Sequence, residues 1–283
     1  MAATGKDILF ARMALIGAGL IGSSLARVAR RQGLAGHIAV SARTQASLDK
    51  ALELGFADSV SLDAAEAAED ADLVVLCTPL GAYGSIAETL APALKPGAIV
   101  SDVGSSKRSV GEALAAALPE AVVIPAHPVA GTENSGPEAG FATLFRHRWC
   151  IVTPKDDTPP DALAALSGFW EGLGATVEIM DPRHHDLVLA VTSHIPHLIA
   201  YTIVGTASDL EEVTRGEVIK YSAGGFRDFT RIAASNPTMW RDVFLSNRDA
   251  VLEVLGRFTE DLSLLQRAIR NGDGDTLYDL FDR

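Results

Sequence analysis

Short apolar runs alternate with stretches of helical periodicity through the first part of the chain. Nearly every residue within a run is apolar, and between the runs apolar positions recur every three to four residues. Runs of this kind, separated by helices, are typical of a parallel sheet that helices cover on both faces. They occupy residues 13–16, 37–40, 73–77, 98–103, 122–126, 149–154 and 175–180.

The pattern changes after residue 180. Strand-like runs stop, and apolar residues recur at helical spacing over longer stretches. Asp181-Pro182 and Asn236-Pro237 each place a capping side chain before a proline, which is typical of the first turn of a helix. Residues 247–270 read as one long amphipathic helix that Asn271-Gly272 ends. We therefore expect an α/β domain over residues 1–180 and an all-α domain over residues 181–283, which forms a homodimer to bury its remaining apolar faces.

Composition narrows the class of protein. The chain has 283 residues, of which 48% are hydrophobic, and its formal net charge is −12. A general nucleic-acid-binding protein needs a basic face, so this class is excluded. Cys77 and Cys150 lie within apolar runs and are expected to be buried and reduced. No apolar run reaches the roughly 18 residues that span a bilayer, and the first residues lack an export signal, so we expect a cytoplasmic protein without membrane contacts.

The first apolar run leads directly into the glycine turn Gly17-Ala18-Gly19-Leu20-Ile21-Gly22, and a helical pattern follows. In a dinucleotide-binding unit the first glycine permits the tight turn, and the second lets the backbone approach the pyrophosphate. The third allows close packing of the helix on the strand. The glycine spacing alone is a weak signal, but here both flanking elements are present. We therefore predict a Rossmann-type dinucleotide-binding domain.

The end of the second run bears on the choice of cofactor. A site for NAD usually has an acidic residue here, which binds the 2′-hydroxyl of the ribose. This chain has Ser41, Arg43 and Thr44 instead, and a cation with hydroxyl groups suits a 2′-phosphate. We therefore expect NADP rather than NAD. Alternatively, Arg43 stacks on the adenine or faces the solvent.

Polar residues follow three later runs. Thr78-Pro79-Leu80 comes after residues 73–77, Gly104-Ser105-Ser106-Lys107 after residues 98–103, and His127-Pro128 after residues 122–126. The carboxyl ends of parallel strands meet at one edge of a sheet, where ligands bind in folds of this class. A histidine at that edge can act as a general base, because the ordinary pKa of histidine lies near physiological pH. His127 is therefore the candidate catalytic residue.

Two clusters in the second half also suggest chemistry. The segment SHIPH at Ser193 places two histidines three residues apart, and GGFRDFTR at Gly224 places Arg227 and Arg231 on one helical face. A planar guanidinium suits a carboxylate, so Arg231 is a candidate substrate ligand, whereas Arg227 is as well explained by surface ion pairs. The four histidines of this half could be considered as zinc ligands, but the sequence has no HExxH motif or cysteine pair that would support zinc binding. These histidines are His184, His185, His194 and His197.

Several segments together resemble the prephenate/arogenate (cyclohexadienyl) dehydrogenases of tyrosine biosynthesis. They are GAGLIGSSLA at Gly17, DVGSSK at Asp102, HPVAGTENSG at His127, SHIPH at Ser193 and GGFRDFTRIAASNPTMWRDVF at Gly224. The resemblance covers nearly the whole chain. It implies a nucleotide-binding sheet domain, a helical dimerisation domain, and oxidation of a cyclohexadienol at C4 by hydride transfer to a nicotinamide. Loss of the ring carboxylate as CO2 then gives the aromatic product.

The resemblance also implies residue roles. His127 takes the proton of the C4 hydroxyl, and Ser105 orients both His127 and that hydroxyl, with the adjacent Ser106 as the alternative. Arg231 binds a substrate carboxylate, and the other substrate contacts are His197, Glu133, Thr132, Gly131 and Trp240. The cofactor contacts are Gly17, Gly19, Leu20, Ile21, Gly22, Ser41, Arg43, Thr44, Thr78, Pro79 and Leu80. Family members that use NAD have an acidic residue where this chain has Ala42 or Arg43, which favours NADP.

Three questions stay open at the level of sequence. Prephenate and arogenate differ in a keto group and an ammonium group, and sequence does not fix the pocket that distinguishes them. A β-hydroxyacid dehydrogenase or imine reductase has the same domain order but commonly relies on a lysine in its helical half, where Lys220 is the only lysine after Lys155. A non-catalytic NADP sensor would have no need of His127, Ser105 and Arg231.

Overall fold

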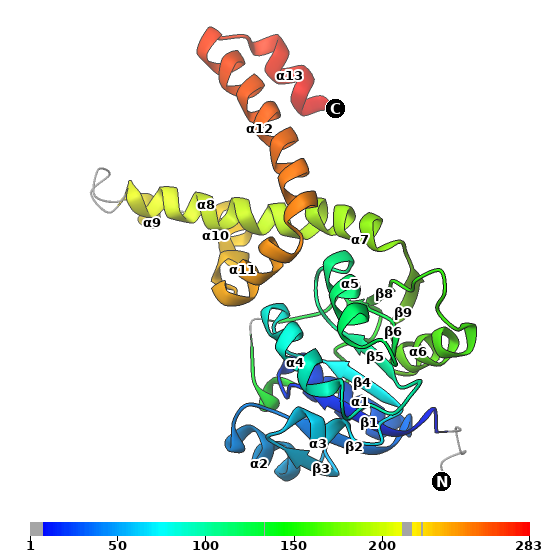
Figure 1. Ribbon diagram of the computed structural model, residues 1–283. Helices are drawn as coiled ribbons and strands as arrows, with labels where there is room; N and C mark the ends of the chain where they lie inside the picture. Colours follow the sequence, from blue (N-terminus) through cyan, green and yellow to red (C-terminus); the bar gives the residue numbers. More distant parts are fainter. Residues whose placement is uncertain (1–7, 133, 211–216, 222) are drawn as a thin grey trace. The chain divides into compact units, whose positions relative to one another are not determined.

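The computed structural model describes residues 8–132, 134–210, 217–221 and 223–283 (Figure 1). The chain divides into two compact units. The first contains the residues up to Asp186 together with Ser235–Ser246, and the second contains Leu187–Ala234 and Asn247–Arg283. A single division after residue 180 differs from these units, because helix α7 (Pro182–Leu189) begins in the first unit and helix α11 (Pro237–Ser246) returns to it.

A six-stranded parallel sheet forms the centre of the first unit, in the order β3-β2-β1-β4-β5-β6. This confirms the predicted parallel sheet. The sequence pattern does not reveal β3, because its three residues form an edge strand that is only partly buried. The strands are β1 (Phe10–Ile16), β2 (Ala35–Ser41), β3 (Ser59–Ser61), β4 (Leu73–Leu76), β5 (Ile99–Asp102) and β6 (Val122–Val123).

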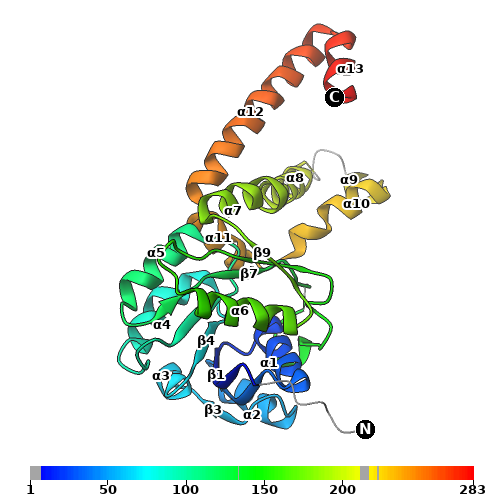
Figure 2. The same cartoon turned by 90° about the vertical axis from the view of Figure 1, so that its right-hand side faces the viewer.

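Helices cover both faces of this sheet (Figure 2). Successive side chains of a strand point to opposite faces, so Met13 and Leu15 lie in one buried cluster and Ala14 and Ile16 in the other. The first cluster includes residues of α1 (Leu20–Gln32), α2 (Gln45–Glu53) and α6 (Pro160–Gly172). The second includes residues of α3 (Ala64–Ala68), α4 (Tyr83–Leu90) and α5 (Arg108–Ala117).

A second sheet has the order β7-β8-β9, with strands β7 (Ala126–Pro128), β8 (Trp149–Val152) and β9 (Thr176–Ile179). β7 is antiparallel to β8, and β8 is parallel to β9. The expectation of one strand over residues 122–126 is therefore wrong. Pro125 has no N–H to continue the first ladder, and its carbonyl accepts a hydrogen bond from Thr153 instead. His127 consequently lies within a strand of the second sheet.

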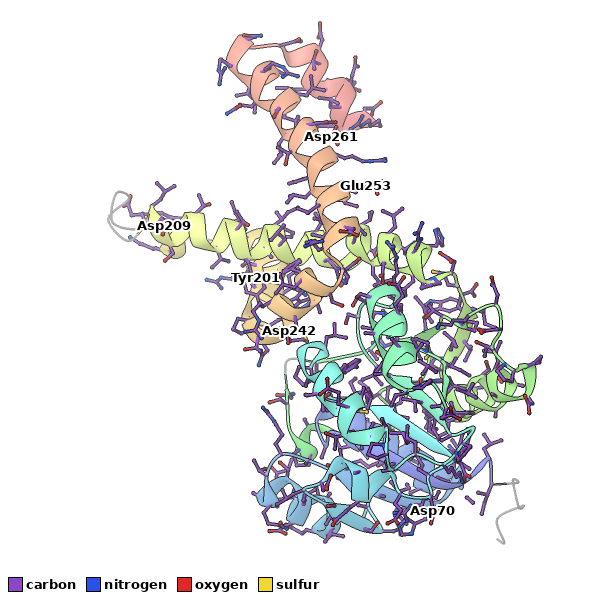
Figure 3. All side chains as sticks on the ribbon, viewed as in Figure 1. Asp70, Tyr201, Asp209, Asp242, Glu253 and Asp261 are labelled. Carbon is purple, nitrogen blue, oxygen red and sulfur yellow. The ribbon has the colours of Figure 1, made fainter. Side chains whose placement is uncertain are left out.

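The described elements of the second unit are helical, as predicted. The long helix α12 (Arg248–Asn271) ends at Gly272, whose φ of 67° gives the left-handed cap expected from the sequence. Glu253 and Asp261 lie along it, and Tyr201 and Asp209 lie along α8 (Ile195–Asp209) (Figure 3). The other elements are the π-helical turn η3 (Ala190–His194), α8 (Ile195–Asp209), α9 (Glu217–Lys220), α10 (Gly224–Thr230), the 3-10 turn η4 (Arg231–Ala234) and α13 (Gly274–Asp282).

The two proline signals also mark true helix starts. Asp181 Oδ1 accepts hydrogen bonds from the backbone N–H groups of Arg183 and His184 at the start of α7. Asn236 Oδ1 accepts from Thr238 and Met239 at the start of α11. Both side chains thus cap the first turn, as the Asp-Pro and Asn-Pro pairs predict.

One helical stretch among the described residues, Pro182–Asp209, is long and apolar enough to cross a membrane by length and composition. Its best window has a mean hydropathy of 1.6, and 28% of that window is buried. The search for uninterrupted apolar runs misses this stretch because histidine, serine and threonine residues interrupt it. Length and composition alone are a weak indication, since the core helix of a soluble protein has the same properties.

Candidate active site

The glycine turn between β1 and α1 leaves space for a ligand at one glycine and none at the other two. Gly17 has a φ of +117°, and a Cβ there would lie 2.7 Å from the carbonyl oxygen of Cys77. A Cβ on Gly22 would lie 2.1 Å from the carbonyl oxygen of Gly17, whereas a Cβ on Gly19 would meet nothing within 4 Å. Gly17 and Gly22 therefore close the turn, and Gly19 faces open space at the helix N-terminus.

This geometry fits the pyrophosphate of a dinucleotide. No side chain of the described residues caps the N-terminus of α1 at Gly19, so the N–H groups of its first turn, which includes Leu20 and Ile21, suit an anion. Thr78 follows β4, and its Oγ1 is buried without a hydrogen-bond partner among the described residues. Pro79 follows, and Leu80 begins the 3-10 turn η1 (Leu80–Ala82). An unpartnered buried hydroxyl beside the turn is consistent with a bound polar ligand.

Substitution of two glycines separates these roles. Gly19→Ala is expected to leave the free energy of unfolding unchanged, because the φ of −77° permits alanine, and to raise the KM for the cofactor at least about tenfold. Gly22→Ala is expected to lower the free energy of unfolding by at least about 1–3 kcal/mol, because the new methyl group overlaps the backbone of Gly17. Thermal unfolding and cofactor titrations measure both. Equal destabilisation by the two changes would contradict this division of roles.

The end of β2 carries the residues expected to select the cofactor. Ser41 is buried, and its carbonyl accepts a 2.8 Å hydrogen bond from the N–H of Gly17. Arg43 and Thr44 are exposed. Thr44 Oγ1 accepts a hydrogen bond of 3.3 Å from Ser47 N and so caps α2. Arg43 is thus the cation at this strand end, while the Thr44 hydroxyl already has a structural role.

A buried ion pair ties the end of β5 to the strand that carries His127. Lys107 and Asp102 are both fully buried, and Lys107 Nζ lies 2.5 Å from Asp102 Oδ2 and 2.8 Å from the carbonyl oxygen of Ala126. Asp102 also accepts hydrogen bonds from the N–H groups of Gly104 and Ala126. Burial lowers the pKa of Lys107, and the carboxylate of Asp102 opposes this shift. The pair therefore joins the two sheets.

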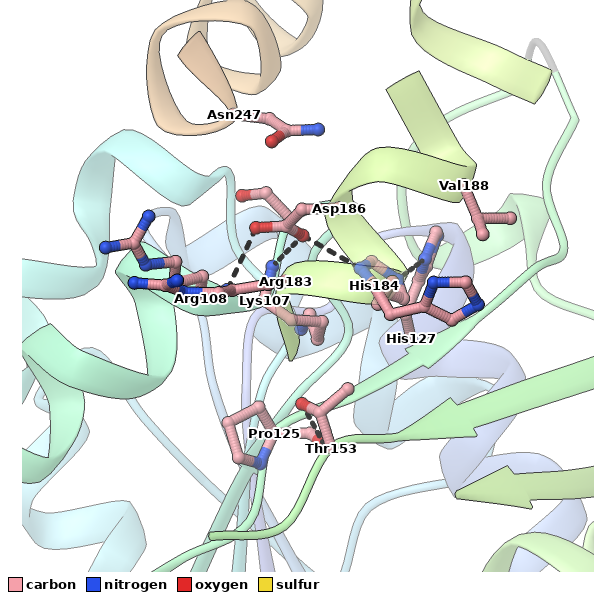
Figure 4. Close-up of polar contacts among 12 residues, drawn as sticks. Lys107, Arg108, Pro125, His127, Thr153, Arg183, His184, Asp186, Val188 and Asn247 are labelled. Carbon is pink, nitrogen blue, oxygen red and sulfur yellow. Dashed lines mark hydrogen bonds and ion pairs between the residues drawn. The ribbon is translucent and has the colours of Figure 1, made fainter. Parts of the chain in front are cut away.

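His127 lies at the start of a hydrogen-bonded chain of side chains (Figure 4). Its exposed fraction is 7%, and its Nδ1 lies 2.9 Å from Nε2 of His185. His185 Nδ1 lies 2.8 Å from Oδ1 of Asp186. Burial lowers the pKa of His185, an effect that the hydrogen bond to Asp186 opposes. The sequence indicates His185 only as one of four histidines considered for zinc, and Asp186 not at all. The adjacency of His185 and Asp186 is the one feature of the sequence that could have indicated this chain of hydrogen bonds.

The two serines after β5 differ in their surroundings. Ser106 is fully buried, and its Oγ lies 2.6 Å from Oγ of Ser246 at the end of α11. Ser105 is partly exposed. Trp240 lies on the same helix α11 with an exposed fraction of 6%, and Asp242 Oδ2 accepts a hydrogen bond from Gly81 N. The hydroxyl of Ser106 thus helps to hold α11 within the first unit.

The remaining candidate residues lie in the loop after β7 and in the second unit. Gly131 and Thr132 are exposed, and Glu133 lies outside the described residues. His197 in the second unit is half-buried and donates from Nδ1 to the carbonyl of Ser193 at 2.8 Å, and burial lowers its pKa. Arg231 is exposed and begins η4. Among the described residues no three His, Cys, Asp or Glu side chains form a metal-binding group.

Comparison with known families assigns nearly the whole chain. Residues 25–179 match the family described as prephenate dehydrogenase, nucleotide-binding domain. Residues 181–283 match the family described as prephenate dehydrogenase, dimerization domain. The chain belongs to the prephenate dehydrogenase family. The predicted order of a Rossmann-type domain and an all-α dimerisation domain is confirmed.

Individual relatives agree with this assignment. Cyclohexadienyl dehydrogenase of Zymomonas mobilis is 44% identical over 273 residues, which are 96% of this chain and 93% of the relative. The crystal structure of Aquifex aeolicus prephenate dehydrogenase with hydroxyphenyl propionate and NAD+ matches with a TM-score of 0.88 and 32% identity, over 99% of this chain and 96% of that one. Synechocystis arogenate dehydrogenase matches with a TM-score of 0.81 and 29% identity, over 96% of each chain. The nucleotide-binding domain and the glycine turn support a nicotinamide dinucleotide as the cofactor.

Proposed function

We propose that this member of the prephenate dehydrogenase family oxidises prephenate, arogenate or both, with NADP as the preferred hydride acceptor. The products are 4-hydroxyphenylpyruvate or tyrosine, with CO2. The observation that carries this proposal is the position of His127, which is almost fully buried in β7 and held at Nδ1 by His185, in a domain with the dinucleotide-binding glycine turn. A histidine held in this way suits a general base.

Each residue has a defined task in this reaction. The cofactor, held at the glycine turn, would supply the acceptor for the hydride of ring C4. His127 takes the proton of the C4 hydroxyl as the hydride leaves. We assign Ser105 rather than Ser106 to orient His127 and the hydroxyl, because Ser106 is buried against Ser246. Loss of the ring carboxylate as CO2 then makes the ring aromatic, and this makes the reaction effectively irreversible.

The residues that bind the substrate are assigned by the family resemblance. By that resemblance we assign Arg231 to a substrate carboxylate and His197, Thr132, Gly131 and Trp240 to further substrate contacts, together with Glu133, which lies outside the described residues. Arg231→Ala is expected to raise the substrate KM at least about thirtyfold, because a charged partner is left without its counterpart, and to change the KM for NADP little. Arg227→Ala on α10 is the matched control, since Arg227 is also exposed. An unchanged substrate KM in R231A, measured by initial rates, would contradict this role.

The preference for NADP rests on Arg43 at the end of β2. A guanidinium suits the 2′-phosphate of NADP, whereas a carboxylate would bind the 2′-hydroxyl of NAD and repel the phosphate. Arg43→Asp is therefore expected to shift the ratio of kcat/KM for NADP over NAD at least about tenfold toward NAD. Initial rates with each cofactor measure the ratio. The same ratio in wild type and R43D would mean that Arg43 faces the solvent.

Assembly and location form a further part of the proposal. The second unit exposes large apolar side chains along α12 and α13, which a second copy would cover as the dimerization-domain family implies. We assign the protein to the cytoplasm as a homodimer, in keeping with the biosynthetic reaction. The exposed apolar side chains of α12 and α13 are Leu252, Leu262, Ile269, Tyr278 and Phe281.

Initial rates with prephenate and with arogenate, each with NADP and with NAD, test the proposed function. We expect turnover of at least one substrate, with a higher initial rate with NADP than with NAD. The four rates also identify the preferred substrate. Absence of turnover in all four combinations would overturn the proposed reaction. Turnover with NAD alone would overturn only the cofactor preference.

A further inference from the structure

His185 and Asp186 form a hydrogen-bonded pair behind His127, all within the first unit. Asp186 is the anchor of this pair. Its Oδ1 accepts a hydrogen bond of 2.7 Å from Lys107 N, and its Oδ2 accepts one of 3.0 Å from Arg108 N, at the N-terminus of α5. A carboxylate in this position is stabilised by the helix N-terminus. Asp186 therefore acts as a hydrogen-bond acceptor toward its neighbours.

The donor and acceptor types then assign the protons along the chain. Because the carboxylate of Asp186 accepts, Nδ1 of His185 carries a proton and donates it. A neutral His185, which burial favours, consequently has an acceptor lone pair at Nε2. That lone pair faces Nδ1 of His127, so Nδ1 of His127 is the donor. The neutral ring of His127 is thereby left with its lone pair at Nε2.

We propose that His185, held by Asp186, is a positioning residue that fixes His127 in the tautomer with Nε2 as the general base. The inference rests on the proposed function, in which His127 takes the proton of the substrate hydroxyl. As that proton arrives, the charge on His127 strengthens its hydrogen bond to the neutral His185, and the dipole of His185 points to the carboxylate of Asp186. A base oriented by a second group in this way is a general device of proton-transfer sites.

The opposing explanation is structural: His185 would serve only to satisfy Asp186 and so to support the cap of α5. Two substitutions distinguish the explanations, because each reproduces one half of the imidazole. The amide of glutamine reaches the position of Nε2 and can accept from His127. The amide of asparagine lies near the position of Nδ1 and can donate to Asp186, but it is too short to reach His127. H185Q thus keeps the contact to His127, and H185N keeps the contact to Asp186.

The positioning role predicts that H185N loses at least about tenfold in kcat, whereas H185Q recovers most of it, with the KM for substrate and cofactor unchanged in both. In H185N the acid limb of the kcat/KM profile is expected to move to lower pH, because His127 loses the acceptor that favours its charged form. The charged groups that act electrostatically on His185 are Asp186, which it contacts, and Lys107 and Asp102, and both variants retain them. Full activity in H185N, or a higher kcat in H185N than in H185Q, would overturn the positioning role of His185.

A measurement without substrate separates this inference from the proposed function. Nitrogen chemical shifts of the His127 ring, recorded by NMR on protein labelled at histidine, report which ring nitrogen carries the proton. Wild type and H185Q are expected to show a protonated Nδ1 and an unprotonated Nε2, and H185N a mixture of tautomers. His37→Gln is the control for histidine substitution, since His37 lies on β2 with its Nε2 2.9 Å from Ser59 Oγ. A protonated Nε2 on His127 in the wild type would overturn the inference even if the enzyme is active, whereas an inactive wild type would overturn the proposed function.

Discussion

Replacement of His127 by asparagine is expected to lower kcat by about 10²–10⁴-fold, the usual contribution of a general base. Asparagine cannot accept the proton of the C4 hydroxyl. The change lies in β7, outside the glycine turn, so NADP binding is expected to stay close to that of the wild type. Single-turnover rates and fluorescence titration with NADPH measure the two effects separately.

The control for this prediction is the folded state of the variant. His127 is almost fully buried, so its substitution could also disturb folding. A loss of activity therefore supports the role of His127 as the base only if H127N unfolds at nearly the same temperature as the wild type. A variant that binds NADPH normally and retains at least half of the wild-type kcat would contradict the assignment of the base. It would favour a protein that senses NADP over one that oxidises a substrate.

Lys107→Met is expected to have the largest effect on stability, a loss of about 3–5 kcal/mol in the free energy of unfolding. Methionine fills the space of the lysine side chain but leaves the carboxylate of Asp102 buried without its cation. Both side chains have an exposed fraction of 0%, so no water compensates the lost partner. Denaturant unfolding at a fixed protein concentration, followed by circular dichroism, gives the difference.

A double substitution tests the cause of this loss. K107M with D102N leaves no uncompensated charge, and the amide of asparagine can still accept a hydrogen bond from Gly104 N, as the carboxylate does now. The double variant is expected to be more stable than K107M alone by at least about 1 kcal/mol. A double variant less stable than K107M would show that packing of the lysine stem, rather than the ion pair, accounts for the effect.

Much of the fold follows from local sequence patterns. The apolar runs predict the central strands because burial on both faces requires nearly continuous apolar residues. The caps at Asp181, Asn236 and Gly272 predict helix ends, because the backbone groups there need partners within a few residues. The exchange of sheets at Pro125 is not predictable in this way, since the apolar run continues through it. Only the pairing of β7 with β8, a contact between distant segments, reveals that the strand has changed partner.

The site is predictable to the extent that its residues follow a motif. His127 and the glycine turn stand out because their neighbours in sequence are also their neighbours in the site. His185 and Asp186 do not, because they reach His127 and α5 from a segment about 60 to 80 residues further along the chain. The buried pair Asp102–Lys107 is likewise hidden, since burial of a lysine is a property of the tertiary structure.

The most direct test of the proposed reaction follows the hydride and the carboxylate in one experiment. Wild-type protein is incubated with NADP and with prephenate or arogenate labelled with deuterium at ring C4, and CO2 and the reduced nucleotide are both quantified by mass spectrometry. We expect one deuterium on the nicotinamide of NADPH for each CO2 released, from at least one of the two substrates. Release of CO2 without deuterium transfer, or no reaction with either substrate, would contradict the proposed reaction.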